Sequence, residues 1–274
     1  MKFDTIIVGC GISGIVLAER LATQKNQSVL IIEKKNHIGG HCYDYYNEDH
    51  LLVHLYGPHI FHTTDTKVWN YLSNFTKWRR YYHRVLASIS GKLVPVPFNL
   101  NSIDRMFPRA LAEQYTNTLI EEFGVDKKVP ILDLLEHPSL SGLANYIYEN
   151  VFFHYTMKQW GVGPEQIDKS VTARVPVFVS RDDRYFQDQY QGLPLHGYTS
   201  MFQNMLNHEN ISVLLNRNAM EMLRIDFDRD EIYFQEERFT GNLIYTGQLD
   251  QLFDYSAGHL PYRSLQFEFE TLHK

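Results

Sequence analysis

The start of the chain alternates between short, wholly apolar runs and an amphipathic stretch. Thr5–Val8 is apolar or β-branched at every position, which is typical of a strand buried on both faces of a parallel sheet. Ile15–Gln24 has a helical pattern, and Ser28–Ile32 is a second apolar strand. The apolar residues at helical spacing between the strands are Val16, Leu17 and Leu21. This pattern predicts a strand–turn–helix–strand unit.

In the middle of the chain the pattern changes from strands to helices. Val85–Ile89 and Leu93–Val96 flank a Ser90-Gly91 turn, which predicts a β-hairpin. From Ser102 to about Gln159 the apolar spacing is helical, and Gly124 is a plausible helix end. The residues spaced by four are Leu111, Tyr115, Leu119 and Phe123, and then Ile147, Val151 and Tyr155. We therefore expect a helical insertion.

Strand patterns return after this insertion. The runs are Ile211–Leu215, Met220–Ile225, Glu231–Phe234 and Leu243–Tyr245. They indicate that the strands of the first, strand–turn–helix–strand unit continue after the insertion. Strands alternating with helical patterns predict an α/β fold that contains a parallel sheet.

A glycine-rich turn, Gly9-x-Gly11-x-x-Gly14, joins the first strand to the first helix. In a dinucleotide-binding turn, Gly9 makes the tight bend, Gly11 lets the backbone approach a pyrophosphate, and Gly14 lets the helix pack closely on the strand. The helix start at Ile12 and Ser13 supplies free N–H groups and a partial positive charge for the phosphates. The alternative is a glycine-rich turn that binds nothing.

A second signal follows the second strand. Glu33 ends that strand, where a carboxylate accepts hydrogen bonds from an adenosine ribose and disfavours a 2′-phosphate. Lys34 follows it, and the pair Gly39-Gly40 before His41 resembles the extended fingerprint of FAD enzymes of the glutathione-reductase and amine-oxidase type. An ordinary glycine-rich loop is the alternative. The expected cofactor is FAD.

Composition narrows the class of protein. Apolar residues make up 44% of the chain, which favours a packed core over disorder. The net charge is −6 without a basic stripe, so nucleic acid is not an expected partner. Cys10 and Cys42 are too few for a disulfide framework and favour a reducing compartment. No segment reaches membrane-spanning length, and we expect a cytoplasmic protein with no membrane partner.

Six ordered motifs carry a more specific resemblance. They are Tyr56–Thr63, Val94–Asn101, Tyr155–Gly161, Asp183–Phe186 with Gly192–Pro194 and Gly197–Thr199, Tyr245–Asp250, and Tyr262–Leu265. Together they resemble the UDP-galactopyranose mutases, and the similarity runs along nearly the whole chain.

The resemblance implies an isomerase that interconverts UDP-galactopyranose and UDP-galactofuranose for surface polysaccharide. FAD would act only in its reduced form, through a flavin N5–sugar adduct, with no net redox change. The family also implies a homodimer. Its members continue beyond Lys274 with further substrate-binding residues, so we expect a truncated chain with impaired turnover. Two alternatives stay open, a flavin oxidoreductase of the amine-oxidase type and a non-catalytic FAD-binding remnant.

Substrate residues follow from the same resemblance. Arg174 matches the arginine that binds the UDP diphosphate, a task suited to two parallel hydrogen bonds from a guanidinium. The residues expected around uridine are Phe152, Tyr155, Thr156, Trp160 and Tyr185. On pattern alone, Arg174 is a solvated surface residue, and Tyr155, Thr156 and Trp160 are core packing of an amphipathic helix. The alternative for Tyr185 is a buried Tyr in a loop.

The resemblance also places two segments beside the flavin. They contain Tyr56, Gly57, Pro58, His59 and Ile60, and, near the other end of the chain, Thr246 and Gly247. His59 and His62 are expected next to the flavin as catalytic neighbours, with structural histidines as the alternative. No Cys or carboxylate completes a metal site with them, so we expect no metal.

These expectations divide the chain into three parts. A Rossmann-type FAD-binding domain is expected over residues 1–84 and 165–260. Residues 102–164 form the helical substrate-binding insertion, and residues 85–101 and 261–274 belong to a partial antiparallel sheet domain.

Overall fold

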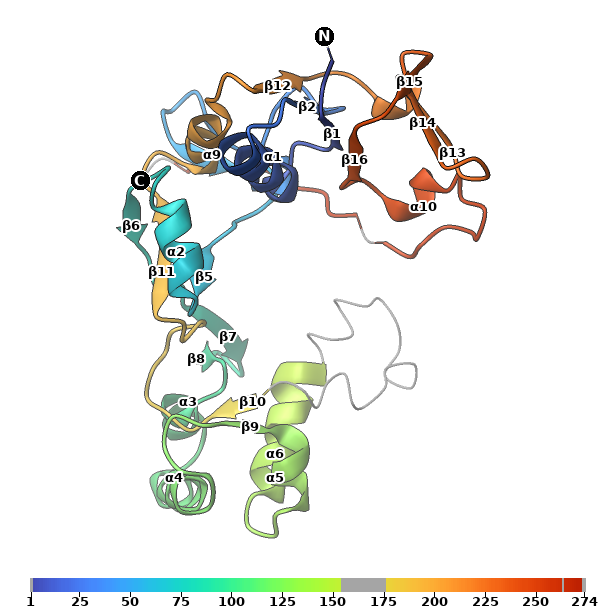
Figure 1. Cartoon of the computed structure of the whole chain (residues 1–274). Helices are drawn as coiled ribbons and strands as arrows, with labels where there is room; N and C mark the ends of the chain where they lie inside the picture. The colour runs from blue at the N-terminus through green and yellow to red at the C-terminus, as the bar shows by residue number, and fades with distance from the viewer. Residues whose placement is uncertain (1, 154–175, 263, 273–274) are drawn as a thin grey trace. The chain divides into compact units, whose positions relative to one another are not determined.

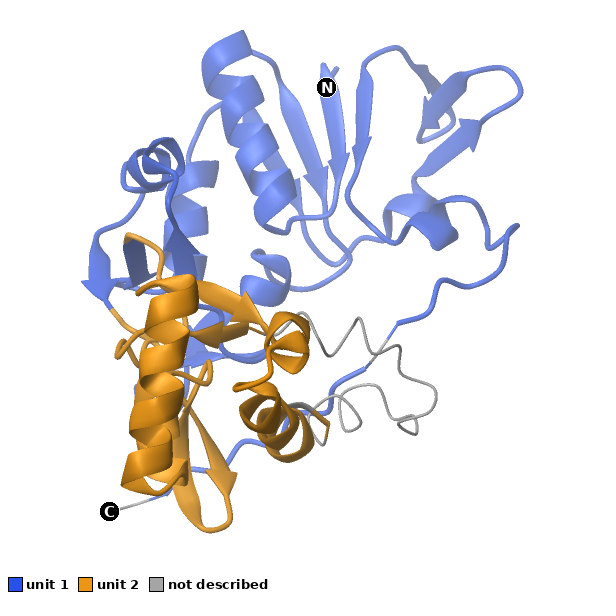
Figure 2. Ribbon diagram, turned by 90° about the horizontal axis from the view of Figure 1, so that it is seen from below, with its two compact units in different colours: residues 1–80, 190–274 blue, residues 81–189 orange. Residues whose placement is uncertain are grey.

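A computed structural model describes residues 2–153, 176–262 and 264–272 (Figure 1). The chain forms two compact units, which are coloured separately in Figure 2. The first unit is Met1–Arg80 with Tyr190–Lys274, and the second is Tyr81–Gln189.

Four parallel strands form the main sheet of the first unit, in the order β12-β2-β1-β16. Their bounds are β1 Thr5–Val8, β2 Val29–Ile32, β12 Ile211–Leu214 and β16 Asn242–Tyr245. In the register, Thr5 lies opposite Val29 on one side and Asn242 on the other. Every residue of β1 and β2 is buried, because both faces of the sheet are covered. The predicted α/β fold with a parallel sheet is confirmed.

Helices α1 (Ile12–Lys25) and α9 (Tyr198–Leu206) pack on one face of this sheet (Figure 1). Ile7 of β1 shares a buried cluster with Ile15 of α1 and Phe202 of α9. The predicted helix is therefore present, but its predicted buried side is wrong for Leu17, which is 38% exposed. The helix instead buries Ile15 together with the smaller residues Ala18 and Ala22. Small side chains allow the helix to lie close to the sheet.

An antiparallel sheet covers the opposite face. Its strands are β13 Leu223–Asp226, β14 Glu231–Phe234 and β15 Glu237–Phe239. Leu223 shares a buried cluster with Ile6 and Leu30 of the parallel sheet, and Phe234 packs against it. Of the strands predicted after the insertion, only those matching β12 and β16 join the parallel sheet. The other two form hairpins, since their connections are too short for a parallel crossover.

Smaller elements complete the first unit. They are the hairpin β3 Asp44–Tyr46 and β4 Leu52–His54, the antiparallel sheet of β5 Phe61–Thr63, β11 Tyr190–Pro194 and β6 Trp78–Arg80, helices α2 Thr66–Leu72 and α10 Leu249–Leu252, and the 3-10 turns η1 Gly40–Cys42 and η4 Ala219–Glu221. Residues 264–272 adopt no strand, although Gln266–His273 alternate like one. Phe269 and Leu272 are 56% and 75% exposed, whereas the Phe267 ring lies beside Gly57.

The second unit combines helices with a hairpin. Its elements are β7 Val85–Ile89, β8 Lys92–Val96, α3 Leu100–Met106, α4 Arg109–Phe123, β9 Lys128–Pro130, α5 Ile131–Glu136, α6 Ser141–Ile147, the π-helical turn η2 Tyr148–Phe152 and β10 Pro176–Phe178. The predicted hairpin is confirmed, and so is the end of α4 at Gly124, which adopts a φ of 80°.

One core holds this unit together. Ile89 and Val94 of the hairpin lie in the same buried cluster as Leu119 and Ile147 of the helices. Residues 81–189 therefore form one unit, which extends on both sides of the predicted insertion at 102–164. The hairpin belongs with the helices because its apolar side is buried against them.

Candidate functional site

A pocket of about 520 Å3 lies at the carboxyl ends of the parallel strands in the first unit. Its size is within the roughly 300–1,000 Å3 of small-molecule and cofactor sites. The glycine turn after β1, the loop after β2 and the segments after β12 and β16 all contribute to its lining. Because ligands of open α/β sheets bind at this edge, the pocket is the candidate site.

Most residues that the sequence predicted for the cofactor line this pocket. They are Gly9, Gly11, Ile12, Ser13, Glu33, Lys34, Gly39, Gly40, His41, Thr246 and Gly247. The lining also includes residues that were not predicted, namely Val8, Ile32, Lys35, Cys42, Asn218, Ala219, Met220, Tyr245, Gln248 and Gln251. Val8, Ile32 and Tyr245 are the last residues of predicted strands, so the rule that strand ends meet at one edge could have found them.

Three glycines are needed for packing within the protein. Gly9 adopts a φ of 103°, and a Cβ there would clash with the Thr246 hydroxyl. A Cβ on Gly14 would clash with the Gly9 carbonyl, and one on Gly40 would lie 2.9 Å from the Gly11 Cα. The Gly39 N–H donates to the Cys10 carbonyl at 2.8 Å, which holds the second glycine loop against the first.

Gly11 differs from these three. Its φ is −80°, which any residue adopts, and a Cβ there would meet only the Gly40 Cα, at 4.0 Å. Gly11 is also the N-cap of α1 and lines the pocket, and no side chain caps this helix end. The missing side chain therefore leaves open space beside the first N–H groups of the helix, where a phosphate fits.

Glu33 is held in the wall of the pocket by two backbone hydrogen bonds. Glu33 is only 7% exposed, and its Oε2 accepts from the Cys10 N–H at 2.8 Å. Its Oε1 accepts from the Lys35 N–H at 2.9 Å. Each carboxylate oxygen has a second lone pair, so both can still accept from a ribose hydroxyl.

Glu33→Gln is expected to lower the free energy of unfolding of the apo protein by about 1–3 kcal/mol, because one buried N–H would face the amide NH2 and lose its acceptor. Urea unfolding followed by circular dichroism measures this difference. The matched control is Glu48→Gln, at an exposed position. Equal stability of the two variants would show that the Glu33 hydrogen bonds contribute nothing.

Neither cysteine is set up as a nucleophile. Burial and then the charge of Glu33 raise the pKa of the Cys10 thiol to about 12. Burial and then the charge of Asp44 raise the pKa of Cys42 as well. Both thiols are therefore protonated at neutral pH, and their contribution is to the shape of the site.

The predicted flavin-side segment Tyr56–Ile60 lies beside the pocket rather than in its lining. The Lys35 Nζ lies 4.0 Å from the centre of the Tyr56 ring, and the His41 ring meets that ring edge-on at 5.6 Å between centroids. Lys35 and His41 both line the pocket. The segment thus contacts the site through Tyr56, while Gly57, Pro58 and Ile60 stand further along it.

The two predicted catalytic histidines have different surroundings. The His59 N–H donates to the His54 Nδ1 at 2.9 Å, and the His59 Nδ1 lies 2.9 Å from the Gly57 carbonyl. Burial lowers the pKa of His54, which keeps its Nδ1 available as an acceptor. His62 is exposed and pairs in register with Gln191 across the sheet. Within the described ranges, no cluster of three or more His, Cys, Asp or Glu could hold a metal ion.

Most of the predicted substrate residues are not placed. Tyr155, Thr156, Trp160 and Arg174 lie outside the described residues, and Phe152 is the last residue of η2. Tyr185 is 37% exposed in the second unit, where its N–H donates to the His83 carbonyl at 2.7 Å. These roles stay predictions. In the part of the chain that the structure describes, no helix has the length and apolar character to cross a membrane.

Two family models match the chain. One, for an NAD(P)-binding Rossmann-like domain, matches residues 7–75, which contain the glycine turn and Glu33. The other, for UDP-galactopyranose mutase, matches residues 150–274.

Solved structures share the fold. The chain matches a crystal structure of reduced UDP-galactopyranose mutase with a TM-score of 0.63 and 19% identity, over 93% of this chain and 56% of that one. It also matches an oxidoreductase from Methanosarcina mazei with a TM-score of 0.52 and 11% identity, over 88% of this chain and 58% of that one. At these identities the likeness shows the fold alone.

Curated relatives are similar over nearly the whole chain. The UDP-galactopyranose mutase of Mycoplasma pneumoniae is 37% identical, over 98% of this chain and 68% of its own. The dTDP-fucopyranose mutase of Escherichia coli is 36% identical, over 96% of this chain and 68% of its own. The chain spans about two thirds of the length of the curated relatives it matches. With this similarity and the Rossmann-type pocket together, the chain belongs to the UDP-galactopyranose mutase family.

Proposed function

We propose that this chain binds FAD in the pocket at the start of α1 and acts in the interconversion of UDP-galactopyranose and UDP-galactofuranose. The observation that carries the proposal is the open space at Gly11 beside the buried Glu33 carboxylate. It gives a pyrophosphate and a ribose adjoining places in one pocket. Family membership supports the reaction, and the substrates are those named in the mutase relatives.

Different residues of the pocket would bind the adenosine ribose and the pyrophosphate of the dinucleotide. Glu33 would accept hydrogen bonds from the adenosine ribose, and the first N–H groups of α1 would bind the pyrophosphate. Gly39 and Gly40 offer a second close backbone approach, because neither carries a side chain into the pocket. Thr246 and Gly247 close the side formed by the end of β16.

Reduced FAD supplies the nucleophile of the mutase reaction when it is bound. The protein would orient the sugar nucleotide for this reaction and exclude water. We propose that Arg174 binds the diphosphate, whose negative charge grows as it leaves, with two parallel hydrogen bonds. Uridine would lie against Phe152, Tyr155, Thr156, Trp160 and Tyr185. His59 and His62 are proposed neighbours of the flavin. Like these roles, the homodimer and the cytoplasmic location are proposed from the sequence.

A second sugar nucleotide has specific support. The Escherichia coli dTDP-fucopyranose mutase is as similar to this chain as the mutase of Mycoplasma pneumoniae, at 36% and 37% identity. Both names describe a pyranose mutase that acts on a nucleoside-diphosphate sugar. The base and the sugar must therefore be distinguished by assay.

The proposal predicts a yellow complex of the purified chain with one FAD, and slow conversion of UDP-galactofuranose after reduction with dithionite. Absorbance measures bound flavin, and chromatography separates the sugar nucleotides. dTDP-fucofuranose is assayed in parallel, and faster conversion of it would transfer the proposal to that substrate.

Two other results would contradict the proposed reaction. A chain that stays colourless after incubation with FAD has no such cofactor site. Bleaching of the oxidised flavin by an amine, without conversion of either sugar nucleotide, would instead support an oxidoreductase.

A further inference from the structure

We propose that His37 is a positioning residue that orients Tyr56, and through it the segment Tyr56–Ile60, beside the cofactor pocket. The inference rests on the proposed FAD site and adds a pair of residues that influence cofactor binding from outside the pocket. Neither side chain is among the residues that line the pocket. Their effect on the cofactor would therefore pass through their neighbours.

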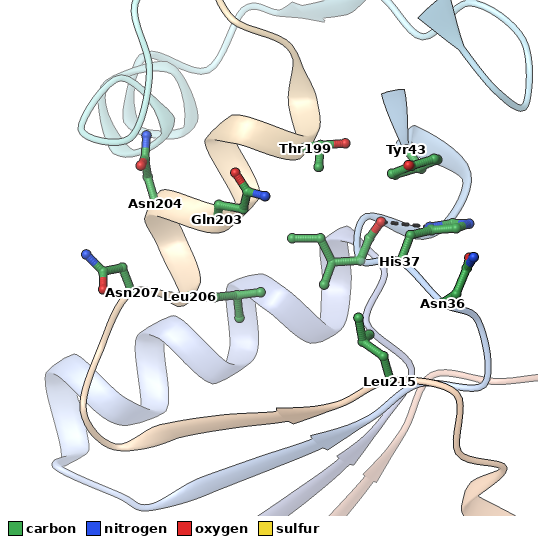
Figure 3. A pocket seen from close by; sticks show the side chains of 10 residues that line it. Asn36, His37, Tyr43, Thr199, Gln203, Asn204, Leu206, Asn207 and Leu215 are labelled. Carbon is green, nitrogen blue, oxygen red and sulfur yellow. Dashed lines mark hydrogen bonds between the residues drawn. The ribbon is translucent and has the colours of Figure 1, made fainter. Parts of the chain in front are cut away.

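The His37 ring is held by a stacked ring and by a contact at each of its two nitrogen atoms. His37 is 9% exposed, and its ring stacks on Tyr43 with centroids 3.8 Å apart and planes 17° from parallel. Figure 3 shows the two rings lying face to face, at one side of a second pocket of about 650 Å3 beside α9. The His37 Nδ1 lies 3.0 Å from the Ile38 carbonyl (Figure 3). Its Nε2 lies 2.9 Å from the Tyr56 hydroxyl.

These two contacts determine where the protons lie. A carbonyl oxygen only accepts hydrogen bonds, so the His37 Nδ1 carries a hydrogen and donates it to Ile38. In the neutral ring the Nε2 is then an acceptor, and the Tyr56 hydroxyl donates to it. The direction of the Tyr56 side chain is thereby coupled to the orientation of the His37 ring.

Three contacts from one short segment converge on Tyr56. His37 binds its hydroxyl, Lys35 lies over its ring, and His41 meets that ring edge-on. Lys35 and His41 line the cofactor pocket, and in the sequence they precede and follow Gly39 and Gly40. A shift of Tyr56 would therefore change the positions of both of these neighbours.

The backbone of Gly57 links the position of Tyr56 to that of His59. Gly57, directly after Tyr56, adopts a φ of 86°, a conformation that favours glycine. The Gly57 carbonyl lies 2.9 Å from the His59 Nδ1. The orientation of Tyr56 is thus passed along the segment to the histidine that the family resemblance places next to the flavin.

The test compares substitutions that keep or remove single hydrogen bonds. His37→Asn keeps a donor for Ile38 and loses the bond to Tyr56, whereas His37→Gln keeps an acceptor within reach of Tyr56. Tyr56→Phe removes only the hydroxyl. Tyr45→Phe is the matched control, since it removes a hydroxyl from a ring that stacks on Tyr43 outside this network. FAD affinity, the visible circular dichroism of bound flavin and the apo stability are measured for each.

We expect His37→Asn and Tyr56→Phe each to weaken FAD binding by about tenfold, the effect of roughly one hydrogen bond. Both should change the flavin circular dichroism in the same way, and the double variant should be no weaker than either single variant. His37→Gln and Tyr45→Phe should stay within about twofold of wild type.

Two results would overturn the inference. One is wild-type affinity and an unchanged flavin spectrum in both His37→Asn and Tyr56→Phe. The other is an additive loss in the double variant, which would mean that the residues act independently. A wild-type chain that binds no FAD would overturn the proposed function together with this inference.

Discussion

Gly11→Ala is expected to weaken FAD binding by about 10- to 100-fold, because a methyl group forced against a bound ligand costs about 1–3 kcal/mol. The apo protein should keep its stability. The backbone at Gly11 has a φ of −80°, and the new Cβ would meet only the Gly40 Cα, at 4.0 Å. The side chain would occupy space that the pyrophosphate needs.

Gly14→Ala is the control that distinguishes a loss of FAD affinity from a loss of stability. Its Cβ would clash with the Gly9 carbonyl, so this variant should lose apo stability. Thermal unfolding without cofactor and a titration of FAD separate the two effects. If Gly11→Ala bound FAD as wild type does, the pyrophosphate could not lie at the start of α1.

Asp44→Ala is expected to lower the free energy of unfolding of the first unit by about 2–5 kcal/mol, because two N–H groups would lose a charged acceptor. Asp44 is 2% exposed, and its carboxylate accepts from the Tyr198 N–H at 2.6 Å and the Thr199 N–H at 2.8 Å. The negative charge also lies at the favourable, N-terminal end of α9. It anchors this helix, whose Phe202 is in the core on one face of the parallel sheet.

Urea unfolding of the apo protein measures this loss. Asp44→Asn should fall between Asp44→Ala and wild type, since an amide keeps one acceptor oxygen. The exposed Asp49→Ala is the matched control and should change little. If Asp44→Ala were as stable as Asp49→Ala, the contact between β3 and α9 would not contribute to the stability of the fold.

Structural elements that depend on neighbouring residues could be predicted from the amino-acid order alone. The apolar run Thr5–Val8 indicated a buried parallel strand, and the two glycine segments with Glu33 predicted the part of the pocket lining formed by the loops after β1 and β2. The hairpin at Ser90-Gly91 and the end of α4 at Gly124 were also predicted. Each of these features follows from periodicity, from the conformational freedom of glycine or from a motif of fixed spacing, and such signals are local.

Contacts between residues that are distant in the sequence were not predictable and became known from the three-dimensional structure. Local spacing assigned Leu17 to the buried side of α1, but packing against the sheet favoured the smaller Ala18. Asp44 binds Tyr198 at the start of α9, which lies 154 residues further along the chain. No sequence pattern around Asp44 could predict a partner at that separation. The contact of His37 with Tyr56 and the approach of Asn218 to the pocket depend on the same long-range folding. A hydrogen bond or a packed surface needs two partners, and the sequence around one partner does not specify the other.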